Sequence, residues 1–132
     1  MVSSQGRGLF NCLTGERLAR DQQPVGTWYD EKQLLARGIG ILDKQTIRLA
    51  GLYGGGLPTT TEDCWSLNLI APTWPDYRVI LSPPFKTIYD DLDVCVQVFQ
   101  DYEIRAYGFS NTGKSFVIAT SSDITMFKRD AI

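Results

Sequence analysis

The sequence predicts an all-β fold with one short helix, and three observations support this prediction. Short runs rich in β-branched and aromatic residues alternate with turns of glycine, proline, asparagine and aspartate. Only residues 30–37 carry the start and stop signals of a helix. Residues 93–128 contain consecutive β-type runs at turn-sized spacing. We therefore expect a mostly antiparallel sandwich or partly open barrel, formed by a single domain over residues 1–132.

The chain is expected to begin with a β-hairpin. Residues 9–13 and 16–20 form its two strands, and Thr14 with Gly15 supplies the turn between them. The one predicted helix comes next. Asp30 is a residue type that commonly caps a helix N-terminus, and Gly38 stands where helices commonly end. These signals predict a short helix near residues 30–37.

Four β-type runs fill the middle of the chain. Residues 47–53 form the first run, and residues 64–71 form the second, in which apolar and polar side chains alternate. Residues 78–82 and 86–89 form two short strands on either side of a Pro-Pro pair, which favours a sheet edge over a sheet centre. The apolar face of the second run consists of Trp65, Leu67, Leu69 and Ala71.

The C-terminal part is predicted to be a four-stranded meander with strands at residues 93–99, 103–109, 114–120 and 123–128. Side chains alternate between the two faces of a strand, so the length of each loop decides which side chains share a face. Short loops between these runs place aliphatic side chains from all four strands on one continuous face, and Ile118 on the other face. The expected neighbours are Val98 with Ile104, Val96 with Ala106, Val94 with Gly108, Ala106 with Val117, Ile104 with Ala119, Ala119 with Ile124, and Val117 with Met126.

Residues 108–115, GFSNTGKS, match the signature of a phosphate-binding loop. Such a loop needs a helix directly after it, because the anion is held by N–H groups at the helix N-terminus. The residues after Gly113 are instead β-branched and aromatic, Lys-Ser-Phe-Val-Ile-Ala-Thr. The signature therefore favours a β-turn in which Gly113 adopts a positive φ, and nucleotide binding stays a second alternative.

The composition argues against catalysis. The 132 residues include no histidine and three cysteines, with 43% hydrophobic and 21% charged residues. Without histidine the chain has no Ser-His-Asp or Cys-His nucleophile, and three cysteines are too few for a four-cysteine zinc site. Although carboxylates, lysine or an activated thiol leave the question of an enzyme open, we expect a non-catalytic protein with no cofactor and no metal.

Charge and hydropathy predict the cellular location of the protein and exclude two classes of partner. The formal net charge is −2, which gives no positive field to attract nucleic acid. The longest apolar run is too short to cross a bilayer, and the N-terminus lacks the apolar stretch of a signal peptide. We expect a cytoplasmic protein that binds neither membrane nor nucleic acid, with Cys12, Cys64 and Cys95 as reduced, buried thiols.

The second face of the predicted meander carries the first candidate site. Tyr107, Phe116 and Phe127 fall on one cross-strand row with Cys95, and Arg105 lies on the next row. In one interpretation the N-terminal hairpin and helix cover these rings as a second core layer. In the other, the rings form a binding surface with Arg105 as its polar anchor.

Two tryptophans and two loops are further candidates. Trp28 and Trp74 lie in loop-like segments, where a tryptophan either plugs the end of a β-core or serves as an exposed anchor. The glycines at 54–56 permit close approach of a ligand but equally suit a sharp bend. Asp90, Asp91 and Asp93 lack the ligand spacing of a calcium loop and favour a solvated turn.

The leading hypothesis is a small acidic protein that binds another protein through the aromatic sheet face or the tryptophan-bearing loops. Inhibitor and immunity proteins are comparable by analogy only. The alternative is a carbohydrate or small-molecule binding domain, including a glycosidase that uses only carboxylates.

Overall fold

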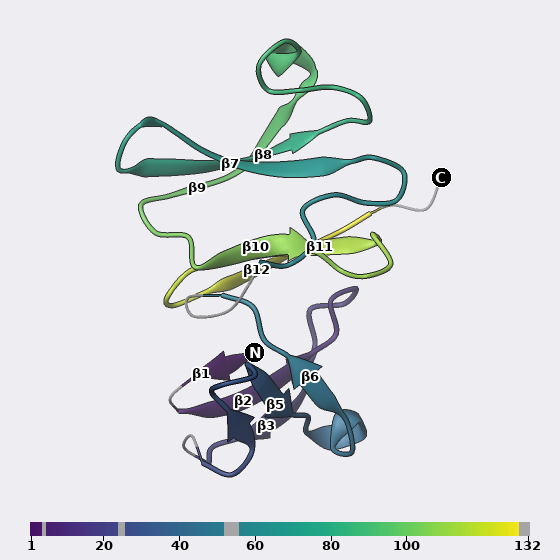
Figure 1. Ribbon diagram of the computed structural model, residues 1–132, viewed down its shortest axis with the longest axis vertical. Helices are drawn as coiled ribbons and strands as arrows, with labels where there is room; N and C mark the ends of the chain where they lie inside the picture. Colours follow the sequence, from purple (N-terminus) through teal and green to yellow (C-terminus); the bar gives the residue numbers. More distant parts are fainter. Residues whose placement is uncertain (4, 24–25, 52–55, 130–132) are drawn as a thin grey trace. The chain divides into compact units, whose positions relative to one another are not determined.

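The computed structural model describes residues 1–3, 5–23, 26–51 and 56–129 (Figure 1). It is nearly all β, with 47% strand and 5% helix, and its described residues form four antiparallel three-stranded sheets. The predicted all-β class is therefore confirmed. The chain divides into two compact units, Met1–Gly55 and Gly56–Ile132, and each is described by itself below.

Unit 1 contains two small sheets, with strand orders β1-β2-β3 and β4-β5-β6. The predicted N-terminal hairpin is present as β2 and β3, where Leu9 pairs with Ala19, and the turn includes Gly15 at a φ of +76°. The first strand ends at Phe10, so residues 11–13 belong to the turn and not, as predicted, to the strand. The elements of this unit are β1 (Val2–Ser3), β2 (Gly6–Phe10), β3 (Arg17–Asp21), β4 (Tyr29–Asp30), β5 (Leu35–Arg37), the 3-10 helix η1 (Gly40–Leu42) and β6 (Thr46–Arg48).

The predicted helix near residues 30–37 is wrong, because this segment is the β4–β5 hairpin. The Asp30 side chain makes the hydrogen bonds of a capping residue, but it makes them in a turn. Its Oδ1 atom accepts the backbone N–H groups of Lys32 and Gln33, at 3.0 and 3.1 Å. Leu34 then adopts a φ of 55°, and Leu35 pairs with Arg48 of β6. Aspartate favours turns and helix N-termini for the same reason, and here pairing with β6 decides between them.

Unit 1 buries Trp28 and Ala36. The guanidinium of Arg7 lies 4.5 Å from the centre of the Trp28 ring, donates to the backbone oxygen of Arg37 at 2.8 Å and pairs with Asp21. One cation thus ties both sheets of the unit to its buried tryptophan.

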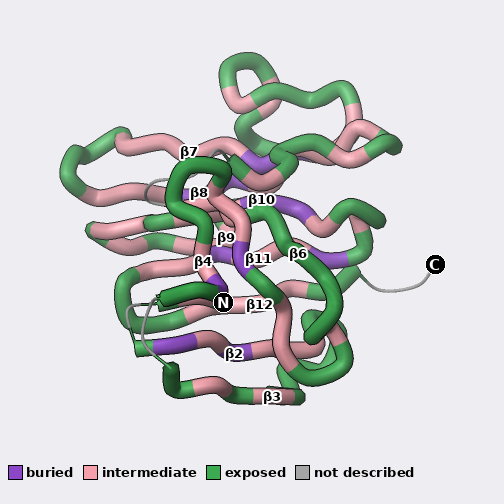
Figure 2. The backbone as a smooth tube through the Cα atoms, turned by 60° about the horizontal axis from the view of Figure 1, so that its bottom comes forward, coloured by how far each residue is buried: buried purple, intermediate pink, exposed green. Residues whose placement is uncertain are grey.

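Unit 2 is a two-layer sandwich of the sheets β7-β8-β9 and β10-β11-β12 (Figure 1). Its core comprises Leu67 and Val79 from the first sheet and Phe109 and Ile118 from the second. Buried positions accordingly recur along β8, β10 and β11 (Figure 2). The elements are β7 (Ser66–Thr73), β8 (Asp76–Ser82), the 3-10 helix η2 (Leu92–Val94), β9 (Val96–Asp101), β10 (Ala106–Phe109), β11 (Ser115–Ala119) and β12 (Ile124–Lys128).

The predicted four-stranded meander is wrong in one strand. β9 pairs with β8, with Val79 opposite Phe99, and the expected pairing of β9 with β10 does not occur. The connection over residues 102–105 carries the chain from one layer to the other. Because a period of two fixes only the face of a side chain, it cannot tell which strand lies alongside.

Two expectations for the middle runs also change. β8 lies at the centre of its sheet rather than at an edge, because both β7 and β9 pair with it. Residues 86–89 form no strand, and there the Asp91 N–H donates to the Thr87 oxygen at 2.8 Å in a turn. The predicted inward face of residues 64–71 is correct for Trp65, Leu67 and Leu69, which belong to the core region.

The register of the C-terminal sheet agrees with the prediction in its faces. Between β11 and β12 the expected pairs are present, with Ala119 opposite Ile124 and Val117 opposite Met126. Between β10 and β11 the register differs by two residues, so Ala106 lies opposite Ala119 instead of Val117. Because this difference is even, each side chain stays on its predicted face.

Candidate functional site

The aromatic row of the C-terminal sheet lies on its inner face. The Phe116 and Phe127 rings stack with centroids 4.6 Å apart, and Phe109 meets Phe116 edge to face at 5.6 Å. These rings and Tyr107 pack against the core formed with the β7-β8-β9 sheet. Of the two interpretations, a covered row agrees with this packing, although the covering layer is this sheet and not the predicted hairpin and helix.

Two members of the predicted row change. Phe109, which the sequence analysis did not select, takes the position opposite Phe116 because the β10–β11 turn is longer than expected. Cys95 precedes β9 and lies outside the row, and its Sγ donates to the Ser82 Oγ at 3.3 Å. From the sequence, Phe109 could have been placed in the row only by assuming a loop between β10 and β11 two residues longer than the four-residue loop that was expected.

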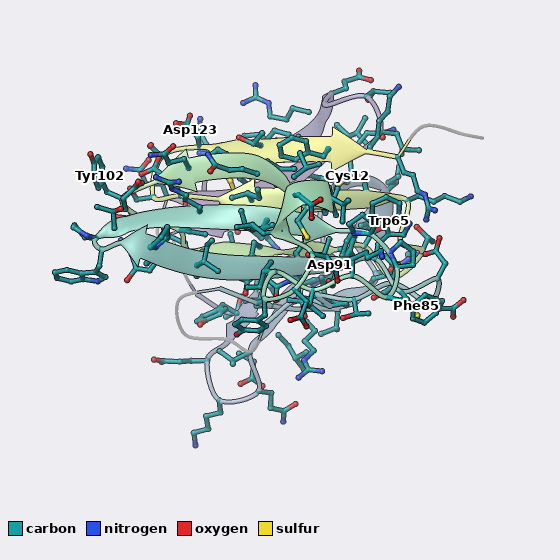
Figure 3. All side chains as sticks on the ribbon, turned by 90° about the horizontal axis from the view of Figure 1, so that it is seen from above. Cys12, Trp65, Phe85, Asp91, Tyr102 and Asp123 are labelled. Carbon is teal, nitrogen blue, oxygen red and sulfur yellow. The ribbon has the colours of Figure 1, made fainter. Side chains whose placement is uncertain are left out.

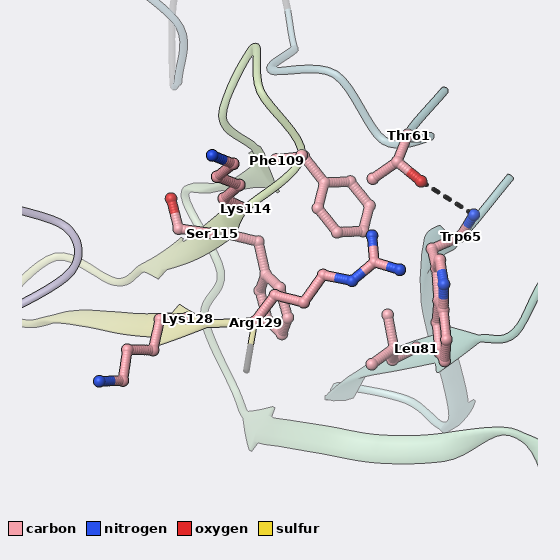
Figure 4. Close-up of a pocket in the computed structure, with 10 residues that line it drawn as sticks. Thr61, Trp65, Leu81, Phe109, Lys114, Ser115, Lys128 and Arg129 are labelled. Carbon is pink, nitrogen blue, oxygen red and sulfur yellow. Dashed lines mark hydrogen bonds between the residues drawn. The ribbon is translucent and has the colours of Figure 1, made fainter. Parts of the chain in front are cut away.

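A pocket of about 160 Å³ opens beside this row, at one end of the unit 2 sandwich (Figure 4). Aromatic and aliphatic side chains form most of its lining, and three basic residues also line it. The aromatic residues are Trp65, Phe109 and Phe116, and the basic residues are Lys114, Lys128 and Arg129.

Arg129 reaches across the pocket toward Trp65 (Figure 4). Its Nη2 lies 2.6 Å from the Asp63 Oδ2, and its guanidinium lies 5.8 Å from the centre of the Trp65 ring. The guanidinium, together with the Thr61 hydroxyl, lowers the pKa of the Asp63 carboxyl to about 2. Thr61 Oγ1 also accepts a hydrogen bond from the backbone N–H of Trp65 at 3.0 Å. The Thr61 and Asp63 side chains therefore hold both the tryptophan and the arginine.

Strand pairing gathers the three cations. Ser115 pairs with Lys128, and the Arg129 N–H donates to the Lys114 oxygen at 2.8 Å. In the described part of the chain, neither Lys114 nor Lys128 has an ion-pair partner. In Figure 4 both ammonium groups point away from the space between Arg129 and Trp65. Three basic residues thus gather along the pocket although the whole chain has a net charge of −2.

The GFSNTGKS segment is a β-hairpin, as predicted. β10 ends at Phe109 and β11 begins at Ser115, so a strand stands where a phosphate-binding loop needs a helix. The Ser110 N–H donates to the Ser115 oxygen at 2.9 Å, and Gly113 turns the chain at a φ of +70°. Lys114 and Gly113 line the pocket through this turn.

The two loop tryptophans, Trp28 and Trp74, differ in burial. Trp28 is buried in unit 1, whereas Trp74 is 74% exposed at the turn between β7 and β8. Tyr102 is also 74% exposed, in the connection that follows β9. The strand pairs Thr73–Asp76 and Tyr77–Asp101 place both turns at the same end of the sheet.

Arg105 lies in the same connection as Tyr102, and its Nε donates to the Glu103 Oε1 at 2.7 Å. This guanidinium lowers the pKa of the Glu103 carboxyl, with a smaller effect from Ser121. In Figure 3, Tyr102 and Asp123 lie at one end of unit 2, and Trp65 and Phe85 lie at the other. The aromatic end around Trp74 is therefore separate from the basic pocket.

Of the two remaining loop candidates, the structure describes only the acidic one in full. The glycines at 54 and 55 lie outside the described residues. Asp90 and Asp91 hydrogen-bond with Thr87 in a turn, and Lys86 lies 3.8 Å from Asp91. Among the described residues, no group of three or more histidine, cysteine, aspartate or glutamate residues is placed to hold a metal ion.

All three cysteines are free thiols, but Cys12 is exposed and Cys64 and Cys95 are half-buried, so the expectation of buried thiols is wrong for Cys12. The described residues include no helix with the length and apolar character needed to span a bilayer. No protein-family model, curated protein or solved structure matches the chain. The function therefore has to be inferred from the geometry of the chain itself.

Proposed function

We propose that this chain is a non-catalytic, cytoplasmic binding protein that recognises another protein through the end of unit 2 that bears Trp74 and Tyr102. The supporting observation is that both side chains are 74% exposed at the same end of one sheet. The name aromatic tip is used below for Trp74 and Tyr102 together. Inhibitor and immunity proteins remain comparable only by analogy.

The chemistry of the aromatic tip suits protein recognition. Tryptophan and tyrosine contribute large contact areas at a low cost in side-chain entropy, and both are enriched among the residues that dominate binding energy. Trp74 lies at the turn of the hairpin formed by β7 and β8, the two longest strands. A paired hairpin holds its turn in place, so the ring is presented with little freedom to lose on binding.

Polar groups flank the two rings. The Arg105–Glu103 pair lies in the same connection as Tyr102, and Arg78 lies 3.3 Å from Asp76, two residues after Trp74. An apolar centre with a polar edge is the usual arrangement of a protein interface. The inner aromatic row does not compete for this role, because it packs inside the sandwich.

The test is capture of partners by the tagged full-length chain from cells that encode it, followed by affinity measurement with the captured protein. Replacing Trp74 and Tyr102 together with alanine should weaken binding by at least about tenfold, because central aromatic anchors commonly contribute 2 kcal/mol or more. Phe85→Ala is the matched control, since Phe85 is 88% exposed but lies at the other end of unit 2. Equal affinity of both variants and the wild type would reject this proposal.

Carbohydrate binding is the second candidate, and one observation favours it. The Gln100 Nε2 donates to the Asp76 Oδ2 at 2.8 Å, so a carboxylate two residues after the exposed Trp74 is joined to an amide. Aromatic faces beside such groups also suit sugars. A panel of sugars read by the Trp74 indole N–H resonance separates the candidates, because saturable shifts with a sugar would replace the protein proposal.

A further inference from the structure

We propose that the basic pocket at the opposite end of unit 2 binds a small aromatic carboxylate, with the ring between Trp65 and Phe116 and the carboxylate on Arg129. This inference does not depend on the aromatic tip. Trp65 precedes β7 and Trp74 follows it, and eight residues in extended conformation span on the order of 25 Å. A small ligand in the pocket cannot reach both.

The size of the pocket selects the size of the ligand. Its volume is about 160 Å³, close to the roughly 150 Å³ of an apolar cavity that accepts benzene. Drug-sized ligands and nucleotides occupy sites of about 300 Å³ or more. A single six-membered ring is therefore the largest group that the pocket encloses.

The side chains that line the pocket favour an apolar, planar ring. Trp65, Leu81, Phe109 and Phe116 present mostly apolar surface to the pocket. Phe109 and Phe116 already meet edge to face, at 5.6 Å and 76°, so their rings leave a slot shaped by aromatic faces and edges. Planar rings stack favourably in such surroundings, with a gain beyond simple burial of apolar area.

The basic residues of the pocket favour a negatively charged ligand. Lys114, Lys128 and Arg129 are among the residues that line the pocket, and within the described residues the only carboxylate paired with any of them is that of Asp63. A guanidinium carries five N–H donors in a fixed plane, and Asp63 accepts from one nitrogen, Nη2. The remaining donors can bind a carboxylate while Asp63 keeps the guanidinium oriented.

A carboxylate accounts for this combination better than a phosphate does. The hairpin over residues 110–115 aims no helix N-terminus at the pocket, and its Ser110 and Gly113 N–H groups donate within the turn. The anion therefore has only side-chain donors in the pocket. Arg129 suits a planar carboxylate, which it can bind with two parallel hydrogen bonds.

The experiment is an NMR titration of the full-length chain with sodium benzoate, read at the Trp65 indole and Gly113 amide resonances. Benzyl alcohol tests the ring without the charge, and inorganic phosphate tests the charge without the ring. We expect saturable shifts with benzoate and at least about tenfold weaker binding of the other two probes, because each lacks one of the two interactions.

Variants identify the groups responsible. Arg129→Gln should weaken benzoate binding about tenfold, and Lys114→Gln, which leaves the Asp63 pair intact, should weaken it by about threefold. Lys44→Gln in unit 1 is the matched control and should leave binding unchanged. Trp74→Ala should also leave it unchanged, which separates this proposal from the one for the aromatic tip.

Three results would overturn the inference. Absence of resonance shifts at millimolar benzoate would show that the pocket does not bind an aromatic carboxylate. Equal affinity for benzyl alcohol and benzoate, with Lys114→Gln and Arg129→Gln unaffected, removes the role of charge. Equal affinity for phosphate and benzoate removes the role of the ring.

Discussion

Asp63 and Arg129 show how two exposed residues join distant parts of the chain. They are 66 positions apart, and their hydrogen bond links the loop before β7 to the end of β12. The Asp63 carboxyl also accepts the Thr61 hydroxyl at 2.7 Å, and Thr61 in turn accepts the Trp65 N–H. At the scale of single residues, this chain of contacts sets the shape of the basic pocket.

The first prediction concerns the titration of Asp63. Its carboxyl should titrate with a pKa of about 2, compared with an ordinary value of 3.8. Arg129→Gln should raise this pKa toward the ordinary value, because the guanidinium is the main cause of the shift. The ¹³C resonance of the carboxyl measures it directly, and an unchanged midpoint in the variant would show that Arg129 is not the cause.

The same pair predicts a pH dependence of stability. Because the folded-state pKa is below the unfolded value, the Asp63 carboxylate stabilises the fold above about pH 4. This contribution is lost as the pH falls through about 2. Asp63→Asn should therefore have a lower melting temperature than the wild type at pH 6, and the difference should shrink as the pH falls through about 2. A constant difference across this range would contradict the prediction.

At the scale of elements, a close backbone approach joins the segment before β7 to the end of β10. The Phe109 N–H donates to the Pro58 oxygen at 2.6 Å, so the segment before β7 lies against β10. Gly108 makes this approach possible, because a Cβ there would lie 2.3 Å from the Leu57 Cβ and 2.9 Å from the Pro58 oxygen. The first glycine of the GFSNTGKS segment therefore has a packing role.

Gly108→Ala should accordingly destabilise the protein by about 1–3 kcal/mol, the range for inserting a methyl group where no space exists. Gly56→Ala is the control, since a Cβ at Gly56 meets nothing within 4 Å. Urea denaturation measures both variants. Equal stability of the two would mean that residues 57 and 58 move aside without cost.

At the scale of the whole molecule, the packed core belongs to unit 2. Its central side chains, Val79 and Ile118, are fully buried, whereas the only buried large side chain in the described part of unit 1 is Trp28. Burial of apolar area is the main favourable contribution to folding, so unit 2 should contribute most of the stability. The single-domain expectation for residues 1–132 then predicts that unit 1 unfolds together with unit 2.

Ile118→Ala tests both statements. It should lower the free energy of unfolding by about 2–5 kcal/mol, whereas Ile41→Ala should change it by less than about 0.5 kcal/mol. The control is suitable because Ile41 is 82% exposed and Ile118 is 0% exposed. The Trp28 and Trp65 indole resonances report on units 1 and 2 respectively. If they disappear at different urea concentrations, the two units unfold separately and the single-domain expectation is wrong.

Local patterns predicted much of the C-terminal sheet and little of the pocket. Phe116 and Phe127 stack as expected because their alternation and a short turn are local properties. Lys128 and Arg129 were not selected, since nothing near them in the sequence indicates that Trp65 lies within reach. Their proximity depends on the stacking of two sheets, which no periodicity records.

The sequence by itself determined the β class, the GFSNTGKS turn and the side chains that share each face of β10, β11 and β12. These properties depend on backbone preferences and on a repeat of two residues, both of which act within a few positions. Only the tertiary structure decided that β9 pairs with β8, that residues 31–37 form no helix and that the inner rings pack against the β7-β8-β9 sheet. Those outcomes depend on which distant strand supplies the better partner for hydrogen bonding and burial, and that choice is made between whole elements.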